Sequence, residues 1–332
     1  MKTFLSGASG FVGGHILKLL ESEGTQVRCL VRPGSARHNF EGSSAELVEG
    51  DLRDAVSVAR AMEGCDTAFH CAGDYRLFVR RPREIYASNV DGTRNVLQAA
   101  ADQGVRRVIY TCTVGTLGPM LDDSAADENS SVGLADMVGH YKRSKFLGKL
   151  EAKAWAERGL PVVIVHPSAP VGEGDHKPTA TGKIILDFVN RRMPAYVHTG
   201  LNLVDVRDVA RGHLLAAERG RDGEEYILGC RNLTLREILQ MLADITGLPP
   251  PRLRLPYWLP LSLAAVDTAI SRVLPREPWL ALEALQLARH RMFFDNAKAR
   301  RELGFDPGPV EEALRRAVDW YSSHGYVRAR PA

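Results

Sequence analysis

The sequence predicts an α/β fold: a Rossmann-type, doubly wound parallel sheet with a smaller, mainly helical C-terminal substrate domain. Two observations support this prediction. In the first half of the 332 residues, short apolar runs alternate with helical patterns, which is the order of βαβ units with a parallel sheet. After Pro167 the alternation stops, and from about residue 231 the pattern is mostly helical and interrupted by prolines.

The predicted strands are nearly all apolar, as expected when helices cover both faces of a sheet. They are residues 3–7, 26–32, 45–51, 67–73, 107–113 and 161–167. Helical patterns separate them, at residues 13–24, 55–65, 89–104 and 141–159. A loop rich in Gly, Pro and Thr follows at 168–182, and residues 204–220 predict a short strand and a helix that return to the first domain.

These elements divide the chain into two portions. We predict a dinucleotide-binding Rossmann domain over residues 1–170, with a return segment at about 201–228. The substrate-binding portion then comprises residues 171–200 and 229–332.

Composition and charge argue against several classes of protein. The net charge is +3, and Lys and Arg are spread along the chain without a basic run, so no nucleic acid partner is expected. Five cysteines without CxxC spacing favour a reducing, cytoplasmic compartment and argue against a metal site. No apolar stretch suits a transmembrane span. The closest, residues 255–274, contains Pro256, Pro260 and Asp267 and is predicted to be a buried or interfacial helix.

The segment GASGFVG follows the first predicted strand and opens the first helix. Glycines there let the backbone approach a pyrophosphate, and a helix N-terminus supplies N–H donors and a positive dipole. We therefore predict a dinucleotide site, with a plain tight turn as the alternative. The expected contact residues are Gly7, Ser9, Gly10, Phe11, Val12 and Gly13.

The segment GHYKRSKF holds Tyr141 and Lys145, four residues apart. On a helix this spacing puts both side chains on one face, one turn apart. The pair suits an acid–base site, but a basic turn on a solvated helix has the same spacing. Lys142 and Arg143, which lie between them, are expected to face solvent.

Together, the two motifs resemble those of the extended short-chain dehydrogenases/reductases, the nucleotide-sugar epimerase and dihydroflavonol reductase type. The resemblance covers nearly the whole chain. Further segments follow that family's order: EGDLRD (49–54), HCAGD (70–74), NVDGTRNVLQAA (89–100), YTCTVGTLG (110–118), HPSAPVGEGD (166–175) and FDNAKARRELGF (294–305). Within this group the chain looks most like the hopanoid-associated sugar epimerase (HpnA) family, through AGDYRLF (72–78), KPTATG (177–182) and MPAYVHTGLNLV (193–204).

The end of the second predicted strand distinguishes the two nicotinamide cofactors. An acidic residue there binds the adenosine ribose and favours NAD, whereas an arginine pairs with the 2′-phosphate of NADP. The segment LVRPGSAR has Arg32 and Arg37 and no acidic residue. NADP(H) is therefore favoured over NAD(H), with a solvated arginine pair as the alternative.

The resemblance implies cofactor contacts beyond the glycine loop. They are Asp51, Leu52, Ala72, Gly73, Asn89, Tyr141, Lys145, Pro167 and Ser168. For two of them the alternative is a helix cap, since Asp51 precedes a predicted helix and Asn89 begins one.

A nicotinamide enzyme needs a proton donor or acceptor beside the carbon that exchanges hydride. A free tyrosine has a pKa of about 10, and a nearby ammonium lowers that pKa. Lys145 is therefore placed to activate Tyr141. The resemblance implies that Thr113, after the fifth predicted strand, orients the substrate oxygen.

Residues on segments expected to face the cleft are candidate substrate contacts: Tyr75, Arg76, His140, His166, Lys177 and Tyr196. Surface exposure is the alternative for most of them. His166 stands where the family pattern implies Asn, and its alternative role is to fill the sheet.

The sequence thus favours an NADP(H)-dependent carbonyl reductase that acts on a hydroxylated aldehyde, keto or sugar-like substrate. That substrate would be a small molecule or a lipid-linked polyol or sugar, with hopanoid side-chain biosynthesis as a setting that the resemblance implies. The alternatives are an NAD-dependent sugar epimerase/dehydratase that retains its cofactor and, less favoured, a non-catalytic NADP-binding regulatory protein. The resemblance also implies a homodimer.

Overall fold

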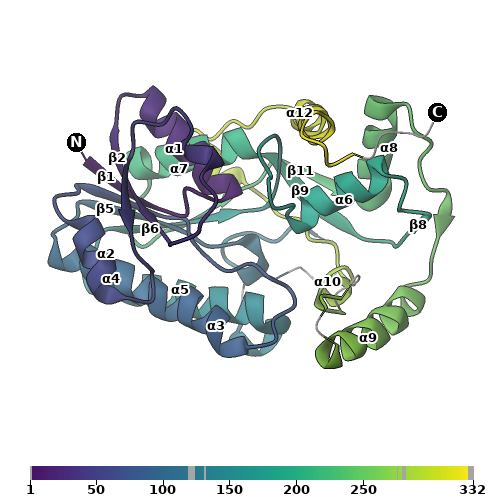
Figure 1. The fold of residues 1–332 in the computed structure, drawn as a ribbon, viewed down its shortest axis with the longest axis horizontal. Helices are drawn as coiled ribbons and strands as arrows, with labels where there is room; N and C mark the ends of the chain where they lie inside the picture. The colour runs from purple at the N-terminus through teal and green to yellow at the C-terminus, as the bar shows by residue number, and fades with distance from the viewer. Residues whose placement is uncertain (1, 119–123, 131, 275, 279–281, 328–332) are drawn as a thin grey trace.

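A sheet of seven parallel strands forms the centre of the protein (Figure 1). The computed structural model describes residues 2–118, 124–130, 132–274, 276–278 and 282–327. In chain order the strands are β1 (Lys2–Ser6), β2 (Gln26–Val31), β3 (Glu46–Glu49), β4 (Thr67–His70), β5 (Arg107–Thr111), β6 (Val162–Pro167) and β10 (Glu225–Leu228). Their order across the sheet is β3-β2-β1-β4-β5-β6-β10, which confirms the predicted α/β fold.

Helices cover both faces of this sheet. One face carries α1 (Phe11–Ser22), α7 (Val206–Arg219) and α11 (Ala297–Leu303), and the other carries α2 (Ala55–Met62), α4 (Gly92–Asp102) and α5 (Gly139–Glu157). β4 and β6 are buried along their whole length, as their apolar sequences predict. Ile16 and Leu17 of α1 are also fully buried, and each such side chain stabilises the fold by about 1.5–3 kcal/mol.

The strand order predicts a crevice at the carboxyl end of the sheet. β1 has β2 on one side and β4 on the other, so the chain connections diverge on either side of β1. Dinucleotides bind at such a switch point in doubly wound folds. The loops that follow β1 and β4 therefore form the two sides of the candidate site.

The C-terminal portion contains a second, smaller sheet of β7 (Ala169–Val171), β9 (Gly200–Asp205) and β11 (Arg231–Thr234). It packs against α6 (Ala180–Val189), α8 (Leu235–Thr246) and α12 (Val310–Ser323) through a separate apolar cluster. The predicted loop at 168–182 thus contains β7. The region after residue 231 also begins with a strand, because β11 finds an antiparallel partner in β9.

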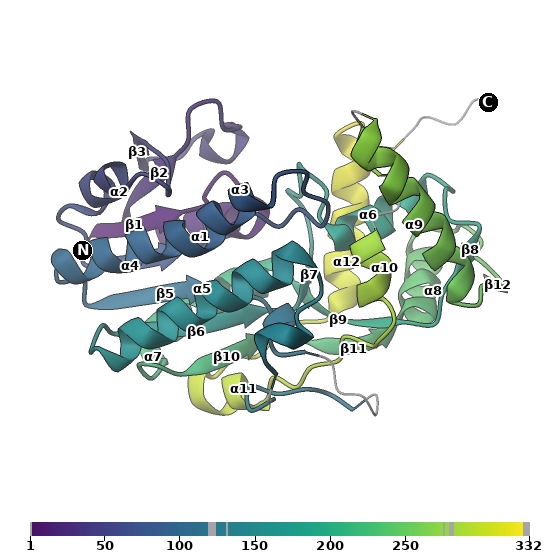
Figure 2. The same ribbon diagram turned by 90° about the horizontal axis from the view of Figure 1, so that it is seen from below.

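Shorter elements complete the described part of the chain. They are η1 (His38–Phe40), α3 (Pro82–Tyr86), the π turn η2 (Ala87–Asp91), η3 (Val114–Thr116), η4 (Leu134–Asp136), β8 (Ala195–Tyr196), β12 (Leu253–Arg254), α9 (Trp258–Val273) and α10 (Leu282–Leu287). Figure 2 shows α9 at the outer margin of the molecule, beside α10. No helix within the described ranges is long and apolar enough to cross a membrane.

Candidate active site

The glycine loop between β1 and α1 has no room for side chains. Gly7 has a φ of +88°, which favours glycine, and a Cβ there would lie 2.6 Å from the Ala72 nitrogen. A Cβ at Gly13 would collide with the Gly7 carbonyl oxygen. The loop after β1 therefore lies directly against the start of α1 and against the loop after β4.

The N-terminus of α1 suits an anion. Helix α1 begins at Phe11, two residues earlier than predicted, and Gly10 at its N-cap has no side chain to bond the first N–H groups. No acidic residue lies in its first turn, so its N–H donors and dipole remain available for phosphate oxygens. The glycine loop, which has no room for a Cβ at Gly7 or Gly13, and the free N–H groups of α1 together fit the pyrophosphate of a dinucleotide.

Asn39, which the sequence did not predict as a site residue, holds the glycine loop through two hydrogen bonds to its backbone. It is buried in η1, and its Nδ2 donates to the carbonyl oxygens of Ala8 (2.9 Å) and Gly10 (3.0 Å). Its side chain also lies where a Cβ of Gly14 would be. No local pattern in the sequence signals this contact, because 29 or more residues separate the partners.

We predict that Gly13→Ala lowers NADPH affinity about 5- to 150-fold, because the added methyl overpacks the turn at a cost of about 1–3 kcal/mol. Isothermal titration of the purified variant measures this affinity. Gly133→Ala is the control, since a Cβ at Gly133 meets only Asp136 Oδ2, at 3.8 Å. Equal affinities in the two variants would contradict a phosphate cradle at this turn.

The adenosine end of the crevice is basic. Arg32 and Arg37 follow β2 and are exposed. Asp51, which follows β3, is engaged by Arg53, whose Nε and terminal nitrogen donate to the two carboxylate oxygens at 2.9 and 2.7 Å. The N-cap of α2 is Asp54, so the capping alternative for Asp51 is wrong. Leu52 is buried.

Asn89 holds the loop that follows β4. Its Oδ1 accepts from the Asp74 nitrogen at 2.7 Å, and its Nδ2 donates to the Asp74 carbonyl oxygen at 2.8 Å and to Ser144 Oγ at 2.9 Å. Asn89 lies within the π turn η2 and caps no helix, so that alternative is wrong. A Cβ at Gly73 would lie 3.3 Å from Asn89 Oδ1 and 3.6 Å from Lys145 Nζ, so this loop meets the predicted catalytic helix.

The structure brings Thr113, Tyr141 and Lys145 together. Tyr141 and Lys145 lie in the first two turns of α5, and the Thr113 side chain is a hydrogen-bond partner of the Tyr141 phenol. Lys145 is buried, and its Nζ donates to the Thr111 carbonyl oxygen at 2.7 Å. Burial raises the pKa of Tyr141 to about 12, against the opposing effect of Thr113. Burial also lowers the pKa of Lys145. The Tyr141 pKa thus lies above its ordinary value and not below it, as the sequence predicted for a tyrosine beside an ammonium, because burial outweighs the effect of nearby groups.

Lys142 departs from the sequence prediction, whereas Arg143 is exposed as expected. Lys142 is buried, with its Cε 3.3 Å from where a Cβ of Gly115 would be. Burial lowers its pKa to about 8. The prediction failed because α5 is covered by η3 and η4 as well as by the sheet, so a residue between Tyr141 and Lys145 is enclosed rather than solvated.

His166 lies beneath Thr113 and is fully buried, so it does not contact substrate and the alternative role in the sheet is correct. Its Nδ1 is 3.0 Å from the Thr113 carbonyl oxygen, and its Nε2 is 2.6 Å from Glu225 Oε2. Glu225 also pairs with Lys149, at 3.5 Å, and with Lys153. Sequence reasoning missed Glu225, since only the pairing of β10 with β6 brings it to His166.

Among the remaining substrate candidates, Tyr75 and Lys177 meet across the rim of the crevice, where the Tyr75 hydroxyl lies 3.5 Å from the Lys177 carbonyl oxygen. Arg76 is bound by Asp74, with its Nε 3.0 Å from either carboxylate oxygen. His140 is half-buried, with its Nδ1 3.2 Å from the Tyr86 hydroxyl.

One predicted contact, Tyr196, lies away from the crevice, whereas Pro167 and Ser168 lie at the carboxyl end of β6. Tyr196 lies in β8 and pairs with β12, on the side of the C-terminal portion away from α5 (Figures 1 and 2). The prediction that it faces the cleft is therefore wrong. Pro167 ends β6. The Oγ of Ser168 is buried without a hydrogen-bond partner, and a Cβ at Gly229 would lie 3.4 Å from it.

Comparison with known proteins gives a consistent family. The model of the NAD dependent epimerase/dehydratase family matches residues 3–229. A protein of Synechocystis sp., provisionally named dihydroflavonol 4-reductase, is 43% identical over 98% of this chain and 96% of its own length. Sterol demethylase protein B of Methylococcus capsulatus is 34% identical over 98% of this chain and its own full length.

A third relative is the 4-hydroxy-2-methyl-3-oxo-4-farnesyl-3,4-dihydroquinoline-1-oxide ketoreductase of Stigmatella aurantiaca, 30% identical over 92% of both chains. Among solved structures, that of gox2253 has a TM-score of 0.88 and 42% identity over 98% of this chain and 99% of its own. A nucleoside-diphosphate-sugar epimerase from Pseudomonas aeruginosa has a TM-score of 0.82 and 27% identity over 99% of both chains.

Proposed function

This chain belongs to the NAD dependent epimerase/dehydratase family, and we propose that it is an NADP(H)-dependent carbonyl reductase within that family. Its substrate is a hydroxylated aldehyde, ketone or sugar-like carbonyl compound. The observation that carries this proposal is the pair Arg32 and Arg37 at the carboxyl end of β2, with no free acidic residue in the position that would bind a ribose.

The charge at this end of the crevice supports NADP(H). Arg53 lowers the pKa of Asp51 most and the charge of Arg32 lowers it least, and the Asp51 carboxylate already accepts two bonds from the Arg53 side chain. Arg32 is therefore left to pair with a phosphate rather than with Asp51. A 2′-phosphate offers the charge-assisted bonds that a guanidinium makes best.

The proposed chemistry reduces a carbonyl to an alcohol. The bound cofactor supplies the hydride. Tyr141 donates its phenolic proton to the carbonyl oxygen, and its raised pKa keeps the phenol protonated at neutral pH, ready to donate. Thr113 orients the same oxygen, and Lys145, held by the Thr111 carbonyl oxygen, offers positive charge to the phenolate that remains.

The names of the relatives support reduction of bulky, apolar carbonyl compounds. One is a ketoreductase of a farnesylated quinoline and another is a sterol demethylase protein. We therefore extend the proposal to a substrate whose carbonyl is carried on a lipid body, of which a hopanoid side chain is one case. An NAD-dependent sugar epimerase that retains its cofactor is the second candidate, favoured by the epimerase among the solved structures.

Cofactor retention separates these candidates. The nucleotide released from purified protein by acid is identified, and stripped protein is titrated with NADPH and with NADH. A reductase leaves an exchangeable site that prefers NADPH. Tightly retained NAD would refute the reductase and direct the search to sugar substrates.

We predict that Arg32→Asp reverses this preference. Loss of a charge-assisted bond to the 2′-phosphate removes about 1.5–3 kcal/mol, so the ratio of NADPH to NADH affinity falls at least about tenfold. Arg60→Asp on α2 is the control, since Arg60 binds only the Glu49 carbonyl oxygen among the described residues. An unchanged ratio in Arg32→Asp would show that this arginine is a solvated loop residue.

A further inference from the structure

Helix α9 has its apolar side outward. Large apolar side chains are exposed at a helical spacing along it: Trp258, Leu263, Val266, Ile270 and Val273. Their exposed fractions run from 42% at Ile270 to 85% at Val273. The residues buried beneath them are Pro260, Ala264, Thr268 and Ser271. This arrangement reverses that of a surface helix, which turns its large apolar residues to the core. Of the two predicted alternatives, a buried helix is therefore wrong and an interfacial helix remains.

Exposed apolar residues extend past both ends of α9. Leu253 precedes the helix at 60% exposure, and Leu274 follows it at 49%. A continuous patch of this kind marks an interaction surface rather than scattered surface residues. We define the α9 face as these two leucines and the five exposed residues of the helix.

The charges around the α9 face are basic. The exposed arc of α9 contains Arg272 and no acidic residue, and Arg252 and Arg254 lie exposed just before the helix. Asp267, toward the other side of α9, is paired with Arg276 at 2.5 Å. None of Arg252, Arg254 and Arg272 forms an ion pair with a carboxylate in the described part of the chain, although the charge of Arg272 acts on the half-buried Glu283 carboxyl.

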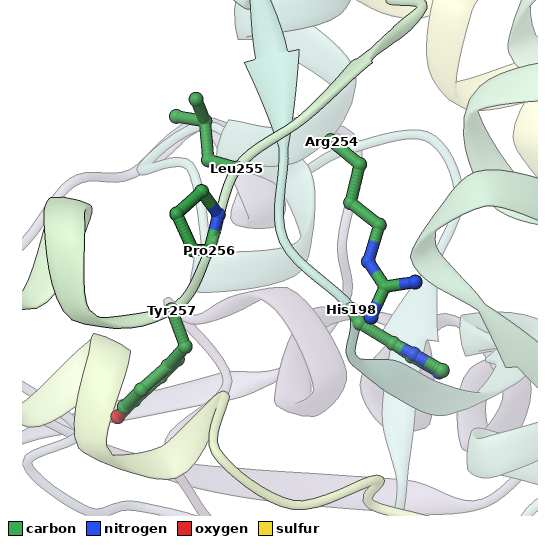
Figure 3. Close-up of a pocket in the computed structure, with 5 residues that line it drawn as sticks. All are labelled: His198, Arg254, Leu255, Pro256 and Tyr257. Carbon is green, nitrogen blue, oxygen red and sulfur yellow. The ribbon is translucent and has the colours of Figure 1, made fainter.

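A hollow adjoins the start of α9. Figure 3 shows the Arg254 side chain extending toward His198 at this hollow, with Leu255, Pro256 and Tyr257 as its other lining residues. Its volume is about 360 Å³, enough for a small anionic group. An exposed arginine thus stands beside an open space where the apolar face begins.

We infer that the α9 face docks on the surface of an anionic lipid bilayer. Apolar residues with a terminal tryptophan enter the boundary between headgroups and acyl chains, and arginines pair with the lipid phosphates. A second copy of the chain is a poorer occupant. A two-fold contact through this face would bring the arginines of both copies together with no carboxylate between them.

The docking surface is tied to the rim of the candidate site. Arg80, in the loop that follows β4, donates to the Ser271 carbonyl oxygen at 3.1 Å and to the Arg276 carbonyl oxygen at 2.9 Å. The Tyr257 hydroxyl donates to the Leu285 carbonyl oxygen at 2.6 Å and so joins α9 to α10. Docking would hold this rim at the bilayer, so that a carbonyl compound carried by a lipid could enter the candidate site from the membrane. This consequence rests on the proposed function, whereas docking itself does not.

Vesicle flotation with the full-length protein tests docking. We expect the protein to float with phosphatidylcholine vesicles that contain phosphatidylglycerol and not with phosphatidylcholine alone. About 1 M salt, with its Debye length of about 3 Å, weakens the binding. Val266→Glu/Val273→Glu lowers the affinity for the anionic vesicles at least about tenfold, while NADPH affinity is unchanged.

The matched control is Val56→Glu/Leu150→Glu, which adds the same charge at two exposed apolar positions on α2 and α5; it should float like the wild type. Absence of flotation with anionic vesicles overturns the inference, as does equal flotation of the α9 variant. Sedimentation that reveals a dimer lost in the α9 variant, without vesicle binding, would assign the face to a second copy. Loss of reductase activity with flotation intact would refute only the proposed function.

Discussion

Replacing Tyr141 with phenylalanine is expected to lower kcat at least about 10³-fold. General acid catalysis contributes about 10²–10⁴-fold, and the Tyr141 phenol, which interacts with the Thr113 side chain, is the proton donor that we propose. Single-turnover kinetics with NADPH and a carbonyl substrate measure the effect. The affinity for NADPH should stay within about twofold, because the ring remains and only the hydroxyl is lost.

The control for this variant is Tyr226→Phe. Tyr226 is buried in β10, and its hydroxyl bonds Glu302 at 3.1 Å. Its loss removes a tyrosine hydroxyl from the core without touching α5. Tyr141→Phe should therefore lose turnover and Tyr226→Phe should keep it. Comparable turnover in the two variants would remove Tyr141 from the mechanism.

Glu225→Gln is expected to lower the free energy of unfolding by about 3–5 kcal/mol at neutral pH, the usual cost of breaking a buried ion pair. The carboxylate compensates His166 and Lys149, both of which are buried. Urea denaturation measures the change. The control is Glu224→Gln, because Glu224 forms a more exposed pair with Lys298, worth about 0–1 kcal/mol.

The pH dependence gives this prediction its sign. Burial acts to lower the pKa of His166, but Cys112 and Glu225 raise it to about 9, above its ordinary value of 6.5. The resulting stability is complete below pH 6.5 and is lost as the pH rises through about 9. His166 and the lysines hold the pKa of Glu225 far below its ordinary 4.5 despite burial, so that stability is lost as the pH falls below 4.5.

The difference between wild type and Glu225→Gln should therefore be largest between about pH 4.5 and pH 6.5. It should shrink as the pH rises from there through about 9, and also as the pH falls below 4.5. If Glu225→Gln lowered the free energy of unfolding at neutral pH as little as Glu224→Gln does, the buried carboxylate would not stabilise the fold. His166 contacts the Thr113 carbonyl oxygen, so Glu225→Gln could also displace Thr113. The NADPH affinity of the variant, measured at a temperature where it is folded, distinguishes this displacement from a loss of stability.

The alternation of apolar runs and helical patterns predicted the central sheet. Spacing identified the glycine loop and the pair Tyr141 and Lys145 as candidates, and the family resemblance favoured their functional interpretation. These features are local: a strand, a turn and one helix face are each encoded within about ten residues. That Thr113 meets Tyr141 followed from the family resemblance, which supplies the order of the strands. Strand limits differed from the prediction by a residue or more at most ends, as β3 shows.

Tertiary structure alone decided which side chains are enclosed. Lys142 is buried because η3 and η4 close over α5, and His166 meets Glu225 because β10 joins the sheet beside β6, 59 residues away in sequence. Asn39 reaches the glycine loop in the same way. The outward direction of the apolar side of α9 could not be predicted from the sequence either, since periodicity shows that a helix has an apolar side but not where that side points. Only packing against the rest of the chain fixes that direction.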